Sequence, residues 1–435
     1  MPAGTNFVWD ENGHWSTAVA QMKSFLSGIS YPAEFSSIYG NLVAYPGFVL
    51  SHLVIWLIQL MDISVPIYGT FHLYLARLLS GFGIAICLHR FCTLAESDHQ
   101  PTWGIVSILS LFLSPLFLQR SFGLSTDIMT HALSILAVSV IFFWDRLNFF
   151  DVFLFFFFGF GTALAKPNVL LLFLSVLVYC HFIYKQEEII STHKLFFFNL
   201  TKAQLFFWAG TLIFLLLGIQ HSIYFFSHQN NVAVIAVKPN ISSARQIDFI
   251  LREPLFTLNI FWREFIENFS THYFWGQSIE KKYPAVYSLF AVNLWQSIFT
   301  TAMIFEFSMI FFHISLRKIY FNFHNIFIGL LFPFVGIVLY ALSIMLTAYV
   351  GWTPVGYHFV TGIQFRYFIP IFIIGLSVLF HSLSKLTKNP NSLGEEIYNA
   401  SISNHLISLT IKGFCFVILV CYGLFFYLGV IGKPV

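Results

Sequence analysis

A polar and aromatic stretch between two apolar runs carries the residues best suited to chemistry. Residues 349–370 hold two prolines, three glycines and several aromatic rings, together with Gln364, Arg366 and Tyr367. A guanidinium is costly in hydrocarbon, so an arginine at the mouth of a membrane helix must reach the interface or bind an anionic partner. We interpret this stretch as part of a phosphate-binding site, with Arg366 as the candidate ligand of the phosphate and Gln364 and Tyr367 as candidate substrate-binding residues.

A second candidate cation, Lys166, precedes Pro167 between two short apolar stretches, 150–165 and 168–184. Proline removes a backbone donor and an ammonium is costly in lipid, so we expect this break to lie at a membrane surface. The sequence offers no acidic residue within ten positions on either side. Lys166 and Arg366 together are suited to neutralise a phosphate through charge-assisted hydrogen bonds.

An acidic pair near the start of the chain is the candidate for proton transfer. Asp10 and Glu11 are followed by His14 and by apolar residues at helical spacing from Trp15 onward. If this pair faces the same side of the membrane as the cations, one of its carboxylates is suited to act as general base for a hydroxyl. The alternative is that both acids only cap a helix, because carboxylates are favourable at a helix N-terminus.

Two further charged residues lie at or inside apolar runs. Asp127 follows Ser125 and Thr126 at the start of one run, where the local sequence favours helix capping over substrate binding. Arg77 lies within another run, at a cost of roughly 2.5–3.5 kcal/mol on insertion scales. It either faces the protein interior and binds substrate there, or extends its side chain to the interface.

The composition places the chain in the membrane. Of its 435 residues, 57% are hydrophobic and 9% are charged, whereas soluble chains carry about 25% charged residues. The net charge of +3 gives no indication of nucleic-acid binding, and five cysteines without a C-x-x-C pair indicate neither a disulfide framework nor a zinc site. We expect an all-α, multi-pass membrane protein with about ten transmembrane helices. The candidate spans are 69–89, 104–120, 127–144, 150–165, 168–184, 205–226, 296–315, 323–349, 366–384 and 411–431.

Lysine and arginine in the short connections predict the orientation, because cytoplasmic connections are enriched in both. Counting membrane crossings places residues 119–126, Lys166, 227–295 and 349–366 together on the extracytoplasmic side. We expect the chain to form a single membrane domain, 1–435, with 349–366 as its active-site loop. The opposite side, which we assign to the cytoplasm, collects Arg90, Arg146, Lys185, Lys194, Lys202, Arg317, Lys318, Lys385 and Lys388.

Two segments are expected to lie on the outer surface as interfacial helices. Residues 227–295 combine mixed charges with short amphipathic pieces, which is typical of helices at the membrane–water interface. The run 43–60 is apolar but contains Pro46 and polar positions, which favours an interfacial helix over a span. In that case residues 1–62 form the first outer loop, on the same side as Lys166.

Taken in order, these residues resemble the motifs of a large bacterial family of polytopic membrane proteins, labelled domain of unknown function 2142. The most distinctive match is Gly362 through Pro370, GIQFRYFIP, which is similar to G-x-Q-G-R-Y-F-x-P. Phe365 replaces the usual glycine, which changes how closely the backbone can approach a ligand. The other matches are Asp10-Glu11-x-x-His14, Ser114-Pro115 with Ser125-Thr126-Asp127, Lys166-Pro167, Arg245-Gln246 through Pro254, and Trp352 through Gly356.

The resemblance implies a function, because that family is grouped with the GT-C glycosyltransferases, which use polyprenyl-phosphate sugar donors. It implies a GT-C-like fold in the bacterial inner membrane and inverting transfer of a sugar to a glycan or lipid acceptor of the cell envelope. By motif, Asp10 would be the catalytic base or the ligand of a divalent cation (Mg²⁺ or Mn²⁺), with Glu11 beside it. The candidate substrate-binding residues are then His14, Arg77, Asp127, Lys166, Gln364, Arg366 and Tyr367.

Family members have a membrane helix before the acidic motif, which only nine residues precede here. An in-frame apolar stretch of about 20 codons upstream of Met1 would supply that helix.

Two other functions fit the composition. A transporter or flippase of a lipid-linked glycan accounts for many spans and intramembrane charge, but it predicts internal repeats and central broken helices, and the sequence shows no obvious repeat. The other is an inactive, scaffold-like relative of the glycosyltransferases. Replacing Asp10 by asparagine separates them, since loss of glycan product with normal membrane insertion indicates catalysis.

Overall fold

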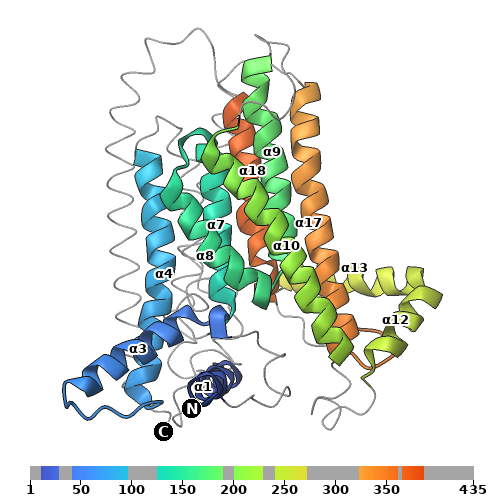
Figure 1. The fold of residues 1–435 in the computed structure, drawn as a ribbon. Helices are drawn as coiled ribbons and strands as arrows, with labels where there is room; N and C mark the ends of the chain where they lie inside the picture. The colour runs from blue at the N-terminus through green and yellow to red at the C-terminus, as the bar shows by residue number, and fades with distance from the viewer. Residues whose placement is uncertain are drawn as a thin grey trace, which may run out of the picture.

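Every regular element in the described part of the chain is helical, as the sequence predicts. The computed structural model describes residues 11–28, 42–96, 125–189, 200–228, 241–271, 323–360 and 365–386. The longer helices stand side by side as a bundle, with α1, α3, α12 and α13 at one end of it (Figure 1). In chain order the α-helices and short 3₁₀ turns (η) are α1 (Glu11–Ser27), η1 (Leu42–Ala44), α3 (Pro46–Leu60), α4 (Thr70–Glu96), α7 (Asp127–Phe143), η2 (Trp144–Arg146), α8 (Phe149–Ala165), α9 (Val169–Ile189), α10 (Lys202–His228), α12 (Ser243–Arg252), α13 (Pro254–Thr271), α17 (Phe323–Trp352), η4 (Phe365–Phe368) and α18 (Ile369–Leu386).

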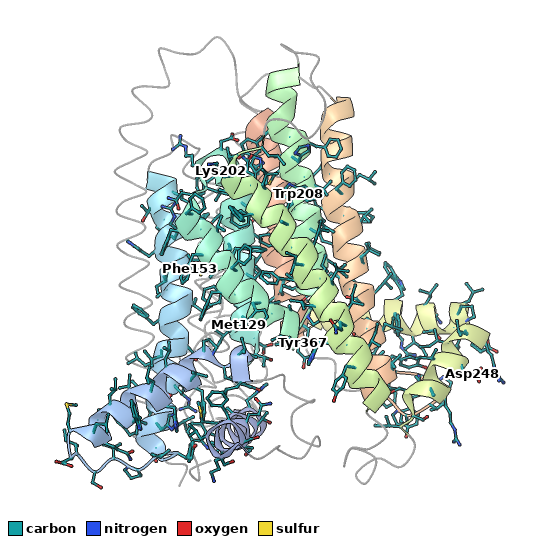
Figure 2. The ribbon with its side chains drawn as sticks, in the orientation of Figure 1. Met129, Phe153, Lys202, Trp208, Asp248 and Tyr367 are labelled. Carbon is teal, nitrogen blue, oxygen red and sulfur yellow. The ribbon has the colours of Figure 1, made fainter. Side chains whose placement is uncertain are left out.

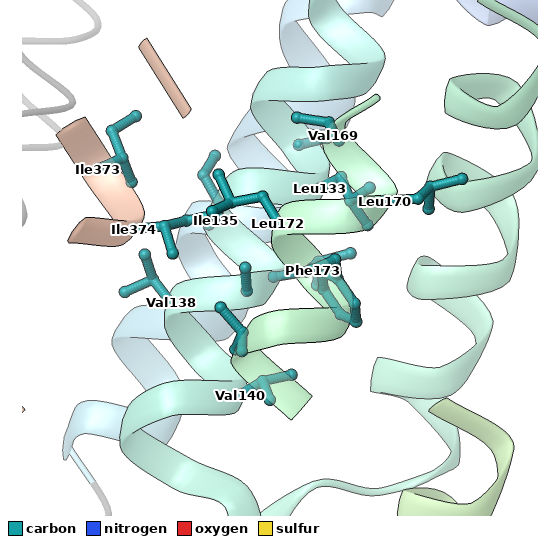
Figure 3. Close-up of a cluster of buried hydrophobic side chains, with 14 of the residues drawn as sticks. Leu133, Ile135, Val138, Val140, Val169, Leu170, Leu172, Phe173, Ile373 and Ile374 are labelled. Atoms are coloured by element: carbon teal, nitrogen blue, oxygen red, sulfur yellow. The ribbon is translucent and has the colours of Figure 1, made fainter. Parts of the chain in front are cut away.

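Helix α7 is the centre of the bundle. All 17 of its residues are buried, and it packs against α4, α8, α9 and α18. A helix that is hydrophobic on every side is stable only where other apolar groups surround it. Figure 3 shows its side chains meeting those of α9 and α18. The labelled members of this buried cluster are Leu133, Ile135, Val138 and Val140 of α7, Val169, Leu170, Leu172 and Phe173 of α9, and Ile373 and Ile374 of α18.

Seven of the predicted spans coincide with helices, namely α4, α7, α8, α9, α10, α17 and α18. The other three, 104–120, 296–315 and 411–431, lie outside the described residues. Among the described residues, the helices long and apolar enough to cross a membrane are Thr70–Ala95, Asp127–Arg146, Lys202–Tyr224 and Leu330–Gly351. The chain is therefore an integral membrane protein, and α8, α9 and α18 contribute shorter apolar stretches to its core.

The loop predicted at 349–366 begins later than expected. Helix α17 continues to Trp352 and stops two residues before Pro354, in keeping with the tendency of helices to end before a proline. The end of the loop forms η4, and residues 361–364 lie outside the described part of the chain.

The two ends of the bundle carry different polar groups, and Figure 2 places Lys202 and Tyr367 at opposite ends. Near the Lys202 end, Arg90 of α4 donates two hydrogen bonds of 2.7 Å to the carboxylate of Asp151 in α8. Asp151 also accepts from the backbone of Asn148, whose side chain caps the same helix. One buried carboxylate therefore joins two helices and closes the first turn of one of them.

The break predicted at Lys166-Pro167 is a tight turn between α8 and α9. The backbone N–H of Lys166 still donates to the carbonyl of Thr162, and the next helix begins at Val169. Helix α10 comes close to this turn because Gly218 has no side chain. A Cβ atom added at Gly218 would lie 2.3 Å from the Cβ atom of Pro167.

Replacing Gly218 by alanine is expected to destabilise the protein by about 1–3 kcal/mol, because the turn or α10 must move to admit the methyl group. Gly375→Ala is the matched control, since a Cβ there meets only the end of the Ile337 side chain at 3.3 Å. Chemical denaturation of both variants in mild detergent measures the difference. Equal midpoints for the two variants would contradict the close approach of α10 to the turn.

Helices α3 and α12–α13 lie on opposite flanks of the bundle, at the Tyr367 end (Figure 1). Helix α3 has Pro46 in its first turn and 15 residues, a length of about 23 Å, which is too short for a hydrocarbon core of about 30 Å. Helix α12 is capped by Ser242, whose hydroxyl accepts from the backbone of Arg245, and α13 begins at Pro254. The interfacial placement expected for both flanks stays a prediction.

Candidate functional site

Two charged residues from different helices form an ion pair at the end of the bundle. Asp127 opens α7, and Lys166 lies 39 positions later, in the turn between α8 and α9. The Nζ atom of Lys166 donates a hydrogen bond to Oδ1 of Asp127. The Asp127 side chain is 3% exposed and that of Lys166 is 27% exposed. The ammonium therefore reaches a surface that the carboxylate does not.

The local fold leaves the Asp127 carboxylate available for this pair. The helix-capping interpretation of Asp127 is wrong, because Thr126 occupies the N-cap position and makes no side-chain cap bond. Instead, the hydroxyl of Ser125 accepts from the backbone N–H of Asp127, and the hydroxyl of Thr130 donates to its carbonyl. The carboxylate then lies in the first turn of α7, where the positive end of the helix dipole also favours it.

An aromatic ring from a third element supports the ammonium. The Nζ atom of Lys166 lies 4.4 Å from the centre of the Tyr367 ring, which is within the range of a cation–π interaction. Tyr367 is held in turn by Tyr340 of α17, whose hydroxyl donates to the Tyr367 carbonyl at 2.6 Å. We call Asp127, Lys166, Tyr340 and Tyr367 the lysine cluster. Its members come from α7, the α8–α9 turn, α17 and η4.

The loop before η4 is held by a defined turn. The backbone N–H of Tyr357 donates to the carbonyl of Pro354 at 3.2 Å, and Gly356 within this turn has a φ of 75°. A positive φ at the third position is typical of a type II turn, which glycine fits without strain. The hydroxyl of Tyr349 donates to the Tyr357 carbonyl at 2.9 Å. The motif Trp352 through Gly356 is therefore part of a structural turn in the loop that leads to Tyr367.

Helix α1, which follows the acidic motif, packs at the same end of the bundle. The Nδ1 atom of His14 lies 2.7 Å from the hydroxyl oxygen of Tyr45, and both side chains are buried. Trp15 belongs to a buried cluster that also holds Tyr45, and Ala165, the residue directly before Lys166, packs against this cluster. The start of α1 and the lysine cluster therefore belong to one end of the protein.

The remaining candidates have different surroundings. Arg77 is buried in α4 with its guanidinium 5.4 Å from the centre of the Tyr74 ring, so it faces the protein interior rather than extending to the interface. Glu11 is the first residue of α1 and Arg366 lies in η4 beside Tyr367, although their side chains are outside the described part. Asp10 and Gln364 lie outside the described residues.

Sequence reasoning missed Tyr340 and the partner of Lys166. Tyr340 lies in the middle of an apolar helix, where its only signal is a hydroxyl that needs a hydrogen-bond partner once buried. Asp127 lies far from Lys166 in the sequence, so no local pattern joins the two.

The lysine cluster is suited to bind an anion. An ammonium has three N–H donors, and one of those of Lys166 is directed at Asp127. The remaining donors can meet anionic oxygens at the exposed side of the ammonium. Within the ranges that the structure describes, no group of three or more His, Cys, Asp or Glu side chains is arranged to hold a metal ion. The candidate metal ligand, Asp10, lies outside these ranges.

A family model described as "Predicted membrane protein (DUF2142)" matches residues 35–374 of the chain. The match includes the whole lysine cluster and the helices that position it. Neither the curated proteins nor the solved structures contain a match.

Proposed function

This chain belongs to the DUF2142 family of predicted membrane proteins, and we propose that it is a membrane glycosyltransferase that uses a polyprenyl-phosphate sugar donor. The proposed reaction transfers the sugar, with inversion, to a hydroxyl of a glycan or lipid acceptor in the bacterial cell envelope. A GT-C-like architecture of about ten spans in the inner membrane is part of the proposal. The observation that carries it is a cation, Lys166, held at the end of a membrane bundle by Asp127 and Tyr367.

The cation is suited to the leaving group of this reaction. When the bond between the anomeric carbon and the phosphate oxygen breaks, its electron pair stays on the phosphate, which becomes more negative. A preorganised N–H donor next to that oxygen stabilises the charge as it develops. Arg366, which lies next to Tyr367 in η4, is the second candidate cation for the same phosphate.

The acceptor side of the reaction needs a base. Asp10, with Glu11 beside it, would take the proton of the acceptor hydroxyl while its oxygen attacks the anomeric carbon from the face opposite the phosphate. A divalent cation (Mg²⁺ or Mn²⁺) bound by Asp10 is the other role that this carboxylate suits. Trp15 of α1 belongs to the buried cluster against which Ala165 packs, and this supports a common site for base and cation.

Replacing Lys166 by methionine is expected to weaken binding of a polyprenyl phosphate by about 10- to 100-fold. The reason is that a hydrogen bond to a charged group contributes roughly 1.5–3 kcal/mol. Native mass spectrometry of the purified protein, titrated with polyprenyl phosphate, measures the change. The uncharged polyprenol is the control ligand and should bind the wild type and the variant alike.

A double-mutant cycle separates phosphate binding from folding. Lys166→Met alone leaves the buried Asp127 carboxylate without its counter-ion, which destabilises the protein. The double variant Lys166→Met/Asp127→Asn removes both charges, so we expect it to recover stability but not phosphate binding. Asp127→Asn alone should keep phosphate binding. If the double variant binds polyprenyl phosphate as tightly as the wild type, the pair is only structural and the proposal is wrong.

The buried Arg77 favours a second candidate, a flippase of a lipid-linked glycan. A charge inside a membrane bundle often marks the path of a polar substrate. Reconstituted vesicles distinguish the two functions. A flippase moves a labelled lipid-linked glycan across the membrane without changing it, whereas a transferase releases free polyprenyl phosphate. If the protein shows neither activity, it is an inactive, scaffold-like member of the family.

A further inference from the structure

Helix α12 presents three different rows of side chains. Ile247 and Leu251, four residues apart, are exposed and apolar. The next row holds Asp248 and Arg252, which form an exposed ion pair, and Figure 2 labels Asp248 at the outer edge of the molecule. A third row, which includes Gln246, is buried against the protein. A helix with separate apolar, charged and protein-facing rows is suited to the boundary between lipid and water.

Helix α13 continues the exposed apolar row. Leu255, Leu258 and Trp262 lie at spacings of three and four residues, which places them on one face, and their exposed fractions are 81%, 50% and 65%. The opposite face, with Thr257 and Phe261, is buried. Tryptophan is enriched at the membrane–water interface because its ring is apolar and its N–H is polar. We call Ile247, Leu251, Leu255, Leu258 and Trp262 the apolar edge.

The opposite flank of the bundle carries a matching surface. Helix α3 lies crosswise at the same end as α12 and α13 (Figure 1). Its outward row is also apolar and exposed, and it includes a second tryptophan, Trp56. Two apolar surfaces on opposite sides of one membrane bundle, at the same end, fit a single membrane surface that surrounds the protein at that level.

The α12–α13 pair is joined to the loop that precedes the lysine cluster. Phe261 packs edge-to-face on Tyr349 with ring centres 5.5 Å apart, and Phe265 packs in the same way on Phe368 at 5.5 Å. The guanidinium of Arg263 donates to the backbone carbonyl of His358. These contacts therefore couple the position of α12 and α13 to the position of the segment that carries Tyr367.

We propose that α12 and α13 form a lipid-embedded hairpin whose apolar edge lies among the acyl chains at the membrane–water interface, level with the lysine cluster. The charged row of α12 faces water, and α3 occupies the same layer on the other flank. The occupant of the apolar edge is thus the bilayer and not a second copy of the chain. The exposed apolar edge and its packing are the same whether or not the chain transfers a sugar.

Spin labels at single cysteines test the hairpin in nanodiscs. The five native cysteines are first replaced by alanine, and then Leu251→Cys, Leu255→Cys and Leu258→Cys report on the apolar edge. We expect relaxation by oxygen, which concentrates in lipid, to exceed relaxation by a water-soluble nickel complex at all three positions. Asp248→Cys should show the reverse order, and the buried Thr257→Cys should be protected from both reagents.

Two results would overturn the proposal. Dominant relaxation by the nickel complex at positions 251, 255 and 258 means that the edge faces water. Protection from both reagents at these positions means that protein, such as a second copy, covers the edge.

A measurement with the native cysteines guards against a cysteine-free variant that fails to fold. Ten tryptophans share the emission of the protein, and Trp262→Phe removes one that we place in lipid. We expect this variant to lose part of the emission that brominated lipids quench in the wild type. Trp144→Phe is the matched control, because Trp144 is buried, and it should leave the quenched amplitude unchanged. An unchanged quenched amplitude for Trp262→Phe would contradict the proposal.

Discussion

Replacing Asp10 by asparagine is expected to lower the rate of sugar transfer by about 10²- to 10⁴-fold, which is the usual contribution of a positioned general base. Asparagine keeps the shape of the side chain but cannot take the proton of the acceptor hydroxyl. In the proposed mechanism the acid acts on the acceptor and Lys166 on the donor phosphate, so Asp10→Asn should leave the affinity for polyprenyl phosphate unchanged. Release of polyprenyl phosphate from a lipid-linked sugar donor, followed in membranes, measures the rate.

The control for this experiment is Asp248→Asn, the same chemical change at an exposed position of α12. It should transfer sugar at the wild-type rate. Transfer by Asp10→Asn at the rate of the control would remove Asp10 from the mechanism. A loss of donor binding in Asp10→Asn would instead place this residue on the phosphate side of the site.

Replacing Asp151 by asparagine is expected to destabilise the protein by about 3–5 kcal/mol. This carboxylate is 1% exposed and bonds Arg90 through both oxygens. Loss of one member of a buried pair leaves the other charge in a poorly solvated place without compensation. The same change weakens the cap at the start of α8, where Asp151 accepts from the backbone of Asn148. Chemical denaturation of the purified protein in mild detergent measures the free energy of unfolding.

The exposed pair in α12 again supplies the control. Asp248 and Arg252 are four residues apart, with side chains 57% and 75% exposed, and such pairs contribute only about 0.3–0.5 kcal/mol. Asp248→Asn should therefore unfold close to the wild type. Arg90→Met combined with Asp151→Asn should recover part of the loss, because no unpaired charge remains. A stability of Asp151→Asn equal to that of Asp248→Asn would show that the pair does not hold α4 and α8 together.

The sequence predicts helices and helix breaks well because both depend on residues within a single segment of the chain. A run of apolar residues is long enough to form a membrane helix whatever its neighbours are, and seven of the predicted spans coincide with helices in the described part of the chain. The break at Lys166-Pro167 follows in the same way, because proline and a lysine end an apolar helix by their own chemistry.

The sequence misled where a residue had two chemically reasonable partners. Asp127 looks like a cap because an acid at the start of a helix usually bonds the backbone. In the structure, the hydroxyl of Ser125 takes that role, and the carboxylate bonds Lys166. Tyr340 gave no signal beyond its hydroxyl, because a tyrosine in an apolar run is common and its partner is a backbone carbonyl on another element.

The amino-acid sequence alone determined that this protein is an all-helical, integral membrane protein with a break at Lys166. These are consequences of hydropathy, helix length and proline, which act within one segment. Tertiary structure decided that α7 is the central helix and that Asp127, Lys166 and Tyr367 meet at one end of it. Contacts between side chains of different helices depend on which face of each helix is directed at its neighbours. The packing of several helices together determines that face.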